Sequence, residues 1–223
     1  FIDFAPTLLE VAGVSEEESG MEPITGRPLT DIFFTERAPH VNPDRDHVLI
    51  GKERHDLGRP GDVGYPIRGI FKGDYLYLRN FEPERWPGGP PETGYMNCDG
   101  SPTKTEILKA RQNPETRHFW EWSFGKRPEE ELYCVAEDPE CVNNLAESEG
   151  HQALKEELRE QMTEELKDQG DPRMFGKGRV FDEYPTASRR LKGYYGRFIK
   201  GELGPANWIN ESDIEEGGEV GSR

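Results

Sequence analysis

The chain has 223 residues, of which 44 are acidic and 28 basic, giving a net charge of −16 with histidine neutral. No apolar run approaches the roughly 20 residues that a membrane-spanning helix needs, and no basic, apolar and small-residue succession at the start indicates a signal peptide. The acidic balance argues against a nucleic-acid partner, which needs clustered Lys and Arg, and 11 Phe, 8 Tyr and 4 Trp argue against disorder throughout.

The first segment is amphipathic from its first residues and lacks an initiator methionine. A helix is predicted over residues 3–12, with Asp3 as its N-cap, Pro6 in the first turn and Gly13 as a stop. We expect the chain to begin inside a larger protein; a processed mature terminus is the alternative.

The central part of the sequence is predicted to be a small sheet. The apolar run 48–50 is typical of a buried strand. Two β-rich runs around a Gly-containing turn predict a hairpin over residues 65–81. Residues 82–105, rich in Pro and Gly, form a long loop of the kind that is usually functional or covers something.

The second half contains the clearest helix, over residues 151–169. Leu154, Leu158, Met162 and Leu166 recur four apart on one face, and Gly170 stops the helix. Residues 186–223 are predicted to be an irregular, disordered acidic tail.

The strongest candidate for a ligand site is the charged end of the strand at 48–50. His55 stands beside Lys52, Glu53 and Arg54, and ligand groups gather at strand carboxyl ends in α/β folds. Lys as a point charge and Arg as a fork would favour an anionic ligand. A solvated turn with mutual salt bridges is an equal alternative.

Two further features leave alternatives open. Cys134 and Cys141 flank a tight turn and could form a disulfide, with free thiols as the alternative. The loop 82–100, with Trp86, and the aromatic segment 117–124 could hold a carbohydrate or pack as ordinary surface. No Gly-rich phosphate loop, GxSxG elbow or recognisable triad is present in the sequence.

Several segments together, in order and spacing, resemble type I sulfatases. Residues 3–13 match the pattern D-x-x-P-T-L-L-x-x-A-G, residues 26–29 are similar to a G-R-S-L turn, and residues 130–146 resemble the E-L-Y-D-x-x-x-D-P-x-E-x-x-N-L signature. The segments at 51–55 (G-K-E-R-H), 64–68, 74–81, 83–87 and 170–173 are similar to the subgroup of heparan N-sulfatase (N-sulfoglucosamine sulfohydrolase).

This resemblance implies a fold: an alkaline-phosphatase-like α/β architecture whose smaller carboxyl-terminal subdomain is α+β, an antiparallel sheet packed with a helix. Residues 1–56 would be the last elements of the large catalytic domain. Residues 57–185 would form the carboxyl-terminal subdomain, which packs on the missing amino-terminal catalytic domain.

The resemblance also implies an activity, the hydrolysis of sulfate esters or sulfamates, with sulfated glycans as substrates, in an exported enzyme. The family uses a formylglycine made in a C/S-x-P-x-R motif beside a calcium ion. Neither Cys98 nor the other two cysteines lies in such a motif, and the calcium ligands would lie upstream. We therefore expect no catalytic or metal-binding residue in this chain, which alone would be inactive.

The site residues that the resemblance implies lie at the G-K-E-R-H segment, which faces the active-site pocket in such enzymes. His55 is the first candidate substrate contact, Lys52 and Glu53 follow, and Arg68 is weaker. A non-catalytic glycan-binding or interaction module, and a phosphatase or phosphodiesterase of the same superfamily, are the alternative functions. Cys134 stands where the family signature has an Asp that is structural at a turn. This departure bears on the local geometry more than on activity.

Overall fold

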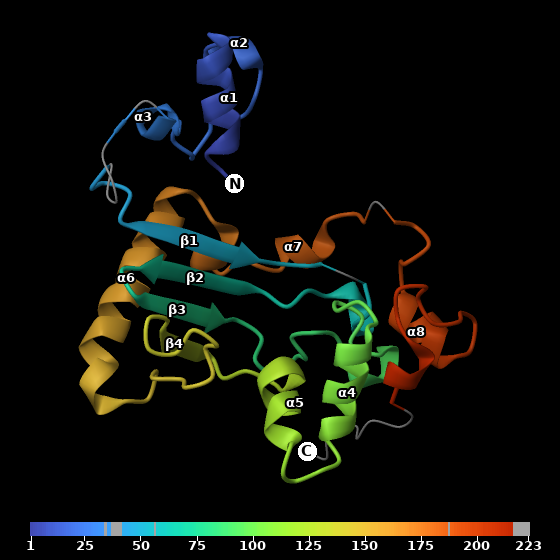
Figure 1. Cartoon of the computed structure of the whole chain (residues 1–223). Helices are drawn as coiled ribbons and strands as arrows, with labels where there is room; N and C mark the ends of the chain where they lie inside the picture. The colour runs from blue at the N-terminus through green and yellow to red at the C-terminus, as the bar shows by residue number, and fades with distance from the viewer. Residues whose placement is uncertain (34, 37–41, 56, 187, 216–223) are drawn as a thin grey trace. The chain divides into compact units, whose positions relative to one another are not determined.

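The computed structural model describes residues 1–33, 35–36, 42–55, 57–186 and 188–215. The chain forms two compact units, residues 1–48 and 49–223, and Figure 1 labels their elements. No helix among the described residues is long and apolar enough to cross a membrane.

The first unit contains three short helices, α1 (Phe4–Ala12), α2 (Glu16–Ser19) and α3 (Thr30–Phe33). The predicted first helix is confirmed, and Gly13 ends it in a left-handed conformation with φ of 68°. Asp3 does occupy the N-cap position, but its carboxylate does not cap the helix. It instead accepts a hydrogen bond from the backbone N–H of Arg27 at 2.8 Å and pairs with Arg45 at 3.2 Å, so it fastens the following loop.

The second unit is built on a four-stranded sheet in the order β1-β2-β3-β4 (Figure 1). Its strands are β1 (His47–Lys52), β2 (Ile67–Lys72), β3 (Tyr75–Asn80) and β4 (Glu130–Cys134). β2 and β3 form the predicted hairpin, and β4 pairs antiparallel with β3. Gly73 turns the hairpin with φ of 58°, a value that glycine adopts without steric cost.

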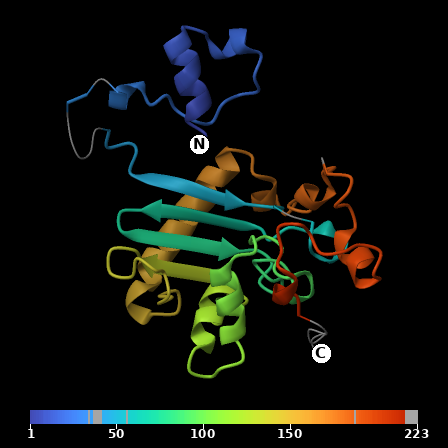
Figure 2. The ribbon, with the colours of Figure 1, turned by 45° about the vertical axis from the view of Figure 1, so that its right-hand side comes forward.

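One face of the sheet is covered by α6 (Gln152–Asp168), which confirms the predicted long helix (Figure 2). Ile70, Tyr77 and Leu132 are register partners in a row across three strands. All three are fully buried and belong to one core cluster with Leu158 and Met162 of the helix. Burial of such side chains, worth roughly 1.5–3 kcal/mol each, holds the helix on the sheet. The α+β arrangement expected for the subdomain is confirmed.

A second cluster lies around α4 (Pro102–Ala110) and α5 (Arg117–Phe124), two helices that pack against each other. Their buried side chains Leu108, Trp120 and Phe124 surround Tyr95, which comes from the predicted long loop. That loop is irregular as expected up to Ser101, apart from the short helix η2 (Pro91–Thr93).

Residues 188–215 pack into the second unit, where the sequence suggested a disordered tail. Tyr194 and Ile209, with Ala206, form a buried cluster around Met96. These few buried apolar residues hold the segment in place. The prediction of disorder rested on the average composition of the segment, which does not reveal them. Residues 216–223 lie outside the described residues. The remaining short helices are η1 (Pro60–Asp62), η3 (Glu149–His151), η4 (Pro172–Phe175), α7 (Val180–Glu183), α8 (Tyr194–Ile199) and η5 (Glu211–Asp213).

Candidate functional site

Lys52 and Glu53, at the end of β1, were predicted to belong to one site, but their side chains lie in different places. Successive side chains of an extended strand point to opposite faces. Lys52, the last residue of β1, lines a cavity beside α4 and α5. Glu53 instead contacts Arg68 of β2 and Arg173 of η4. The structure therefore divides the predicted site residues between two locations.

The first location is an ion cluster made of Glu53, Arg68, Asp171 and Arg173. Arg173 holds Glu53 with both arms, at 2.5 Å and 2.6 Å. Arg68 Nη2 lies 2.7 Å from Glu53 Oε1, and Arg68 Nε lies 2.5 Å from Asp171 Oδ2. Two cations and two anions thus neutralise each other, and three of the four side chains are more than nine-tenths buried.

The surroundings of the ion cluster favour the charged state of its members. Burial acts to raise the pKa of Asp171, but hydrogen bonds from Arg68 and from the Arg173 backbone, together with both charges, outweigh it and lower the pKa. The guanidinium groups of Arg68 and Arg173 also lie over the ring of Phe181, at 5.6 and 5.5 Å. A substrate could reach Glu53 or Arg68 only by breaking these pairs, so the geometry favours a structural role for both.

His55 is exposed, and it lines neither the cavity at Lys52 nor the cavities along α4, α5 and α6. Its neighbour Arg54 fastens the segment after β1, because its guanidinium donates to the carbonyls of Asp182 and Tyr184 at 3.0 and 2.5 Å. Asp56, which follows His55, lies outside the described residues.

The second location is a cavity of about 450 Å³, which we name the cationic cavity. Its charged side chains are Lys52, Lys104 and Arg127, and no carboxylate of the described residues lines it. Its other lining residues are hydroxyl-bearing, small or apolar: Pro87, Gly88, Cys98, Ser101, Thr103, Ile107, Ser123 and Phe124. A local positive site of this kind is notable in a chain of net charge −16, because it can attract an anion that the surface as a whole repels.

Lys104 is the buried cation of the cationic cavity. Its side chain is only 2% exposed, and its Nζ donates to the carbonyls of Gly94 and Cys98 at 2.7 and 2.6 Å. Burial lowers the pKa of this amine, while the charge of Asp213, 3.7 Å away, acts to raise it. Lys104 therefore connects the long loop to α4 and forms an ion pair with Asp213 of η5.

The other two cations come from separate elements. Lys52 is placed by the end of β1, and Arg127 follows α5, where its Nη2 donates to the carbonyl of Trp122. That carbonyl takes one of the five donors that a guanidinium offers. The cavity can therefore present a point charge and a fork, with hydroxyl groups between them, to one anionic ligand.

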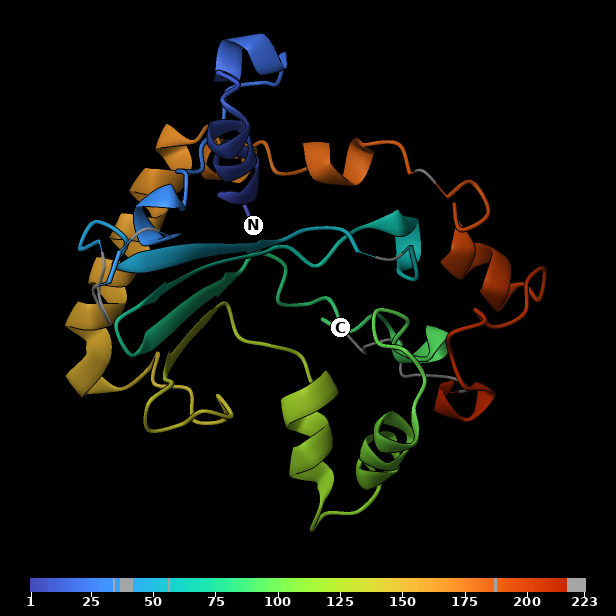
Figure 3. The same ribbon diagram turned by 45° about the horizontal axis from the view of Figure 1, so that its top comes forward.

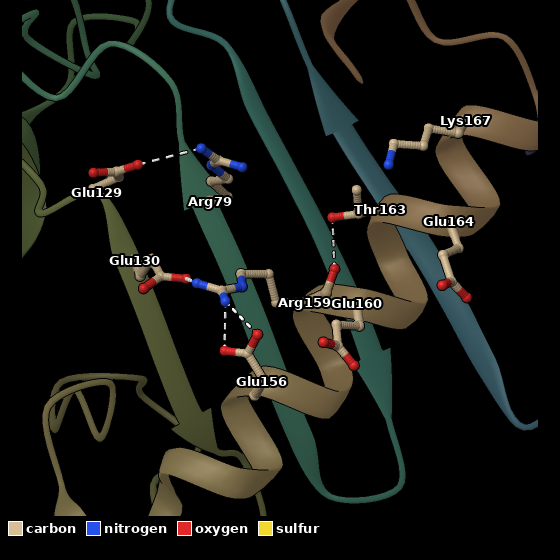
Figure 4. Close-up of a pocket in the computed structure, with 9 residues that line it drawn as sticks. All are labelled: Arg79, Glu129, Glu130, Glu156, Arg159, Glu160, Thr163, Glu164 and Lys167. Carbon is tan, nitrogen blue, oxygen red and sulfur yellow. Dashed lines mark hydrogen bonds and ion pairs between the residues drawn. The ribbon is translucent and has the colours of Figure 1, made fainter. Parts of the chain in front are cut away.

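A larger groove of about 620 Å³ lies between α6 and the edge of the sheet (Figure 4). Its lining contains five carboxylates and three cations. Arg159 donates to Glu156 and lies 3.6 Å from Glu130, and Arg79 lies 3.3 Å from Glu129, as the dashed lines of Figure 4 show. Excess negative charge argues against an anion there.

Among the described residues, no group of three or more His, Cys, Asp or Glu is arranged to hold a metal ion. The three cysteines are free, so the disulfide between Cys134 and Cys141 is not formed and the free-thiol alternative applies. Cys134 is buried in β4. Burial, followed by the negative charges of Asp138, Glu131 and Glu140, raises the pKa of the Cys141 thiol, which disfavours its reactive thiolate form.

Comparison with known proteins gives one sequence relative of clear relevance. No family model matches the chain. It is 28% identical over 175 residues to the ulvan-active sulfatase of Formosa agariphila, covering 77% of this chain and 26% of that protein. The expected similarity to sulfatases is confirmed, whereas the subgroup of heparan N-sulfatase is not.

Two solved structures are also similar. One is BT4656 in complex with its substrate D-glucosamine-2-N,6-O-disulfate, with 18% identity, a TM-score of 0.45 and coverage of 76% of this chain and 24% of that one. The other is a putative sulfatase from Bacteroides thetaiotaomicron, with 16% identity, a TM-score of 0.44 and coverage of 85% and 28%. This chain spans about a quarter of the length of the relatives that it matches.

Of the three cavity cations, only Lys52 belongs to the charged segment after β1 that the sequence singles out. Lys104 and Arg127 were missed, because neither belongs to a recognisable motif. The one local signal was the sequence Ser101-Pro102, an N-cap followed by proline, which predicts the start of α4 and with it the position of Lys104.

Proposed function

We propose that this chain is the carboxyl-terminal part of a sulfatase that hydrolyses sulfate esters or sulfamates of glycans. Its own contribution is to bind the sulfated sugar in the cationic cavity. The observation that carries the proposal is the lining of that cavity, whose described residues include Lys52, Lys104 and Arg127 but no carboxylate. Similarity to a sulfatase supports the choice of sulfate as the anion.

The cavity is chemically suited to a sulfated sugar. An ammonium group and a guanidinium fork complement the oxygens of a tetrahedral anion. The hydroxyl groups of Ser101, Thr103 and Ser123 can pair with sugar hydroxyls, and Phe124 offers an apolar wall. A few convergent polar groups on an apolar lining are typical of small-ligand sites.

The chemical step is assigned to segments outside this chain. In the proposal a formylglycine and a calcium ion, the latter supplying charge stabilisation at the sulfate oxygens, belong to the catalytic domain. The residues of this chain bind and orient the sugar. Exposed apolar side chains on α1, at Phe4, Leu8 and Val11, support packing of the first unit on another part of the protein. Export of the whole enzyme is part of the same proposal.

A non-catalytic glycan-binding module is the second candidate. One observation favours it: all lining residues of the cationic cavity belong to the second unit, residues 49–223. Both candidates share the same ligand and the same cavity, and they differ in whether turnover accompanies binding. A phosphatase or phosphodiesterase is less well supported, because the sequence relative is a sulfatase.

Binding to the 223-residue chain tests the proposed cavity. Glucosamine 6-sulfate and unsulfated glucosamine are titrated by calorimetry against the wild type, Lys52→Gln and Arg127→Gln. We expect binding of the sulfated sugar only, weakened about tenfold by either substitution, since a charge-assisted hydrogen bond is worth about 1.5–3 kcal/mol. Lys200→Gln, at an exposed lysine outside the cavity lining, is the matched control. Equal binding of both sugars would contradict the proposal.

A turnover assay tests the assignment of the chemical step. The same chain is incubated with a chromogenic aryl sulfate, with and without calcium. We expect no hydrolysis in either condition. Calcium-dependent turnover would show that the nucleophile lies within this chain.

A further inference from the structure

The two helices beside the cationic cavity carry a groove that extends away from it. A second cavity, of about 690 Å³, is lined by residues of α4 and α5 and of the segment between them. Both cavities are lined by Thr103 and Ile107. Because they share one stretch of α4, the two cavities are neighbours, and we name them together the α4–α5 groove (Figure 3 shows the two helices side by side).

Helical spacing places several of the lining residues on one side of each helix. Thr103, Ile107 and Ala110 are four and three residues apart on α4, and Phe119 and Ser123 are four apart on α5. Residues at these spacings lie on one face of a helix. From Thr103 to Ala110 the groove runs about 10 Å along α4, which is longer than a single sugar ring.

The far end of the α4–α5 groove carries exposed aromatic side chains. Phe119, which lines the groove, is 49% exposed, and Trp122, which neighbours Phe119 outside the groove lining, is 43% exposed. Their ring centroids lie 5.9 Å apart, and His118 contacts both, at 4.1 and 4.8 Å. The inward face of α5 uses Trp120 for the core instead, so the outward aromatics are not needed to pack the helix.

The two ends of the groove differ in the ligand chemistry they suit. The cationic cavity suits a sulfate group, whereas the negative faces of aromatic rings suit the polarised C–H groups of a sugar ring. The groove is also lined by Asn113 and Thr116 in the turn between the helices and by the ion pair of Lys109 and Glu106. The amide and hydroxyl groups can pair with sugar hydroxyls. A ligand that satisfies both ends must be elongated, anionic at one position and ring-shaped at another.

We propose that the α4–α5 groove binds several consecutive sugars of a sulfated polysaccharide, with one sulfate in the cationic cavity and a further sugar stacked on Phe119 and Trp122. The cationic end of this inference rests on the proposed function. The aromatic end is independent of it and makes affinity depend on the length of the sugar chain.

The experiment compares a heparin disaccharide with a heparin octasaccharide, titrated by calorimetry against the 223-residue chain. We expect the octasaccharide to bind about tenfold more tightly than the disaccharide. Phe119→Ala and Trp122→Ala are each expected to remove most of this gain and to leave disaccharide affinity unchanged, because a central aromatic anchor contributes this much to many interfaces. Phe175→Ala, at an equally exposed phenylalanine outside the groove lining, is the matched control, and circular dichroism verifies folding.

The outcomes separate this inference from the proposed function. If the wild type binds neither oligosaccharide, the assignment of the cationic cavity fails and the groove assignment fails with it. If the disaccharide binds through Lys52 and Arg127 but the octasaccharide gains nothing, only the groove is overturned. A length gain that survives both Phe119→Ala and Trp122→Ala also overturns it, because the gain then comes from charge alone.

Discussion

Single side chains decide how the end of β1 is used. Arg173 grips Glu53 through two parallel contacts, a geometry that the point charge of lysine cannot reproduce. Buried ion pairs add little stability relative to apolar packing, but removing one partner leaves an uncompensated charge and is costly. We therefore expect the ion cluster to affect stability most clearly when one of its members is removed.

The pH dependence of stability provides a test of the ion cluster. The pKa of Asp171 is lowered from 3.8 in the folded chain, so its contribution is present above pH 4 and is lost as the pH falls through the folded pKa. We expect Asp171→Asn to lower the free energy of unfolding by about 2–4 kcal/mol at pH 7. The difference between variant and wild type is expected to shrink steadily below pH 4, as measured by urea denaturation.

A matched variant controls for the charge change itself. Asp168→Asn alters an exposed carboxylate at the end of α6, and we expect its stability to differ from wild type by less than about 0.5 kcal/mol at either pH. A gap for Asp171→Asn that is as large at pH 2.5 as at pH 7 would contradict the role of its ionised form.

The site residues show where prediction from sequence stops. The charged cluster at the end of β1 was identified because a strand followed abruptly by charges is a local signal. Alternation along a strand separates the side chains of Lys52 and Glu53, but the groups that each one meets, Arg173 and α4, lie 50 to 120 residues away in the chain. The sequence around β1 does not identify these partners. The prediction therefore assigned to a single site residues that the structure divides between two locations.

Whole elements were predictable in proportion to their local periodicity. The β2–β3 hairpin and α6 follow directly from alternating and four-residue patterns. The buried face of α5 is harder to predict, because aromatic residues occur on both its buried and its exposed faces, as Trp120 and Phe119 show. Residues 188–215 were misjudged because Tyr194 and Ile209 find their packing partner in Met96, a contact between distant segments.

The β2–β3 pairing depends on a glycine at a close approach. A Cβ added at Gly69 would lie 2.8 Å from the carbonyl oxygen of Tyr77 and 2.6 Å from Leu78 Cδ2. We therefore expect Gly69→Ala to destabilise the fold by about 1–3 kcal/mol, the usual cost of overpacking, measured as a shift of the urea midpoint. Gly150→Ala is the control, because its added Cβ meets no atom within 4 Å. Equal stability of the two variants would show that β2 and β3 can separate at no cost.

The whole molecule carries 44 acidic and 28 basic residues. Its net negative charge makes the surface carboxylates repel one another, and dissolved salt screens this repulsion. The same salt weakens attraction between the cationic cavity and a sulfate. We expect 0.3 M NaCl, compared with 0.02 M, to raise the midpoint of thermal unfolding by a few degrees and to weaken glucosamine 6-sulfate binding several-fold. Thermal scans and calorimetry on one preparation measure both effects, and sucrose serves as the uncharged control. A lower midpoint in salt would mean that ion pairs outweigh the general repulsion.

The long-range fastenings of the second unit have a consequence for synthesis of the chain. Arg173 and Glu53 are 120 residues apart, Arg54 and Asp182 are 128 apart, and Thr105 and Asp213 are 108 apart. At about 5–20 residues per second, a ribosome needs roughly 6–24 s to make such an interval. During that time β1 and the hairpin have emerged while α6, which covers them, and the partners of Glu53 and Arg54 have not. Newly made chains therefore expose an uncovered sheet face and unpaired charges, and this interval is when a chaperone would have most to bind.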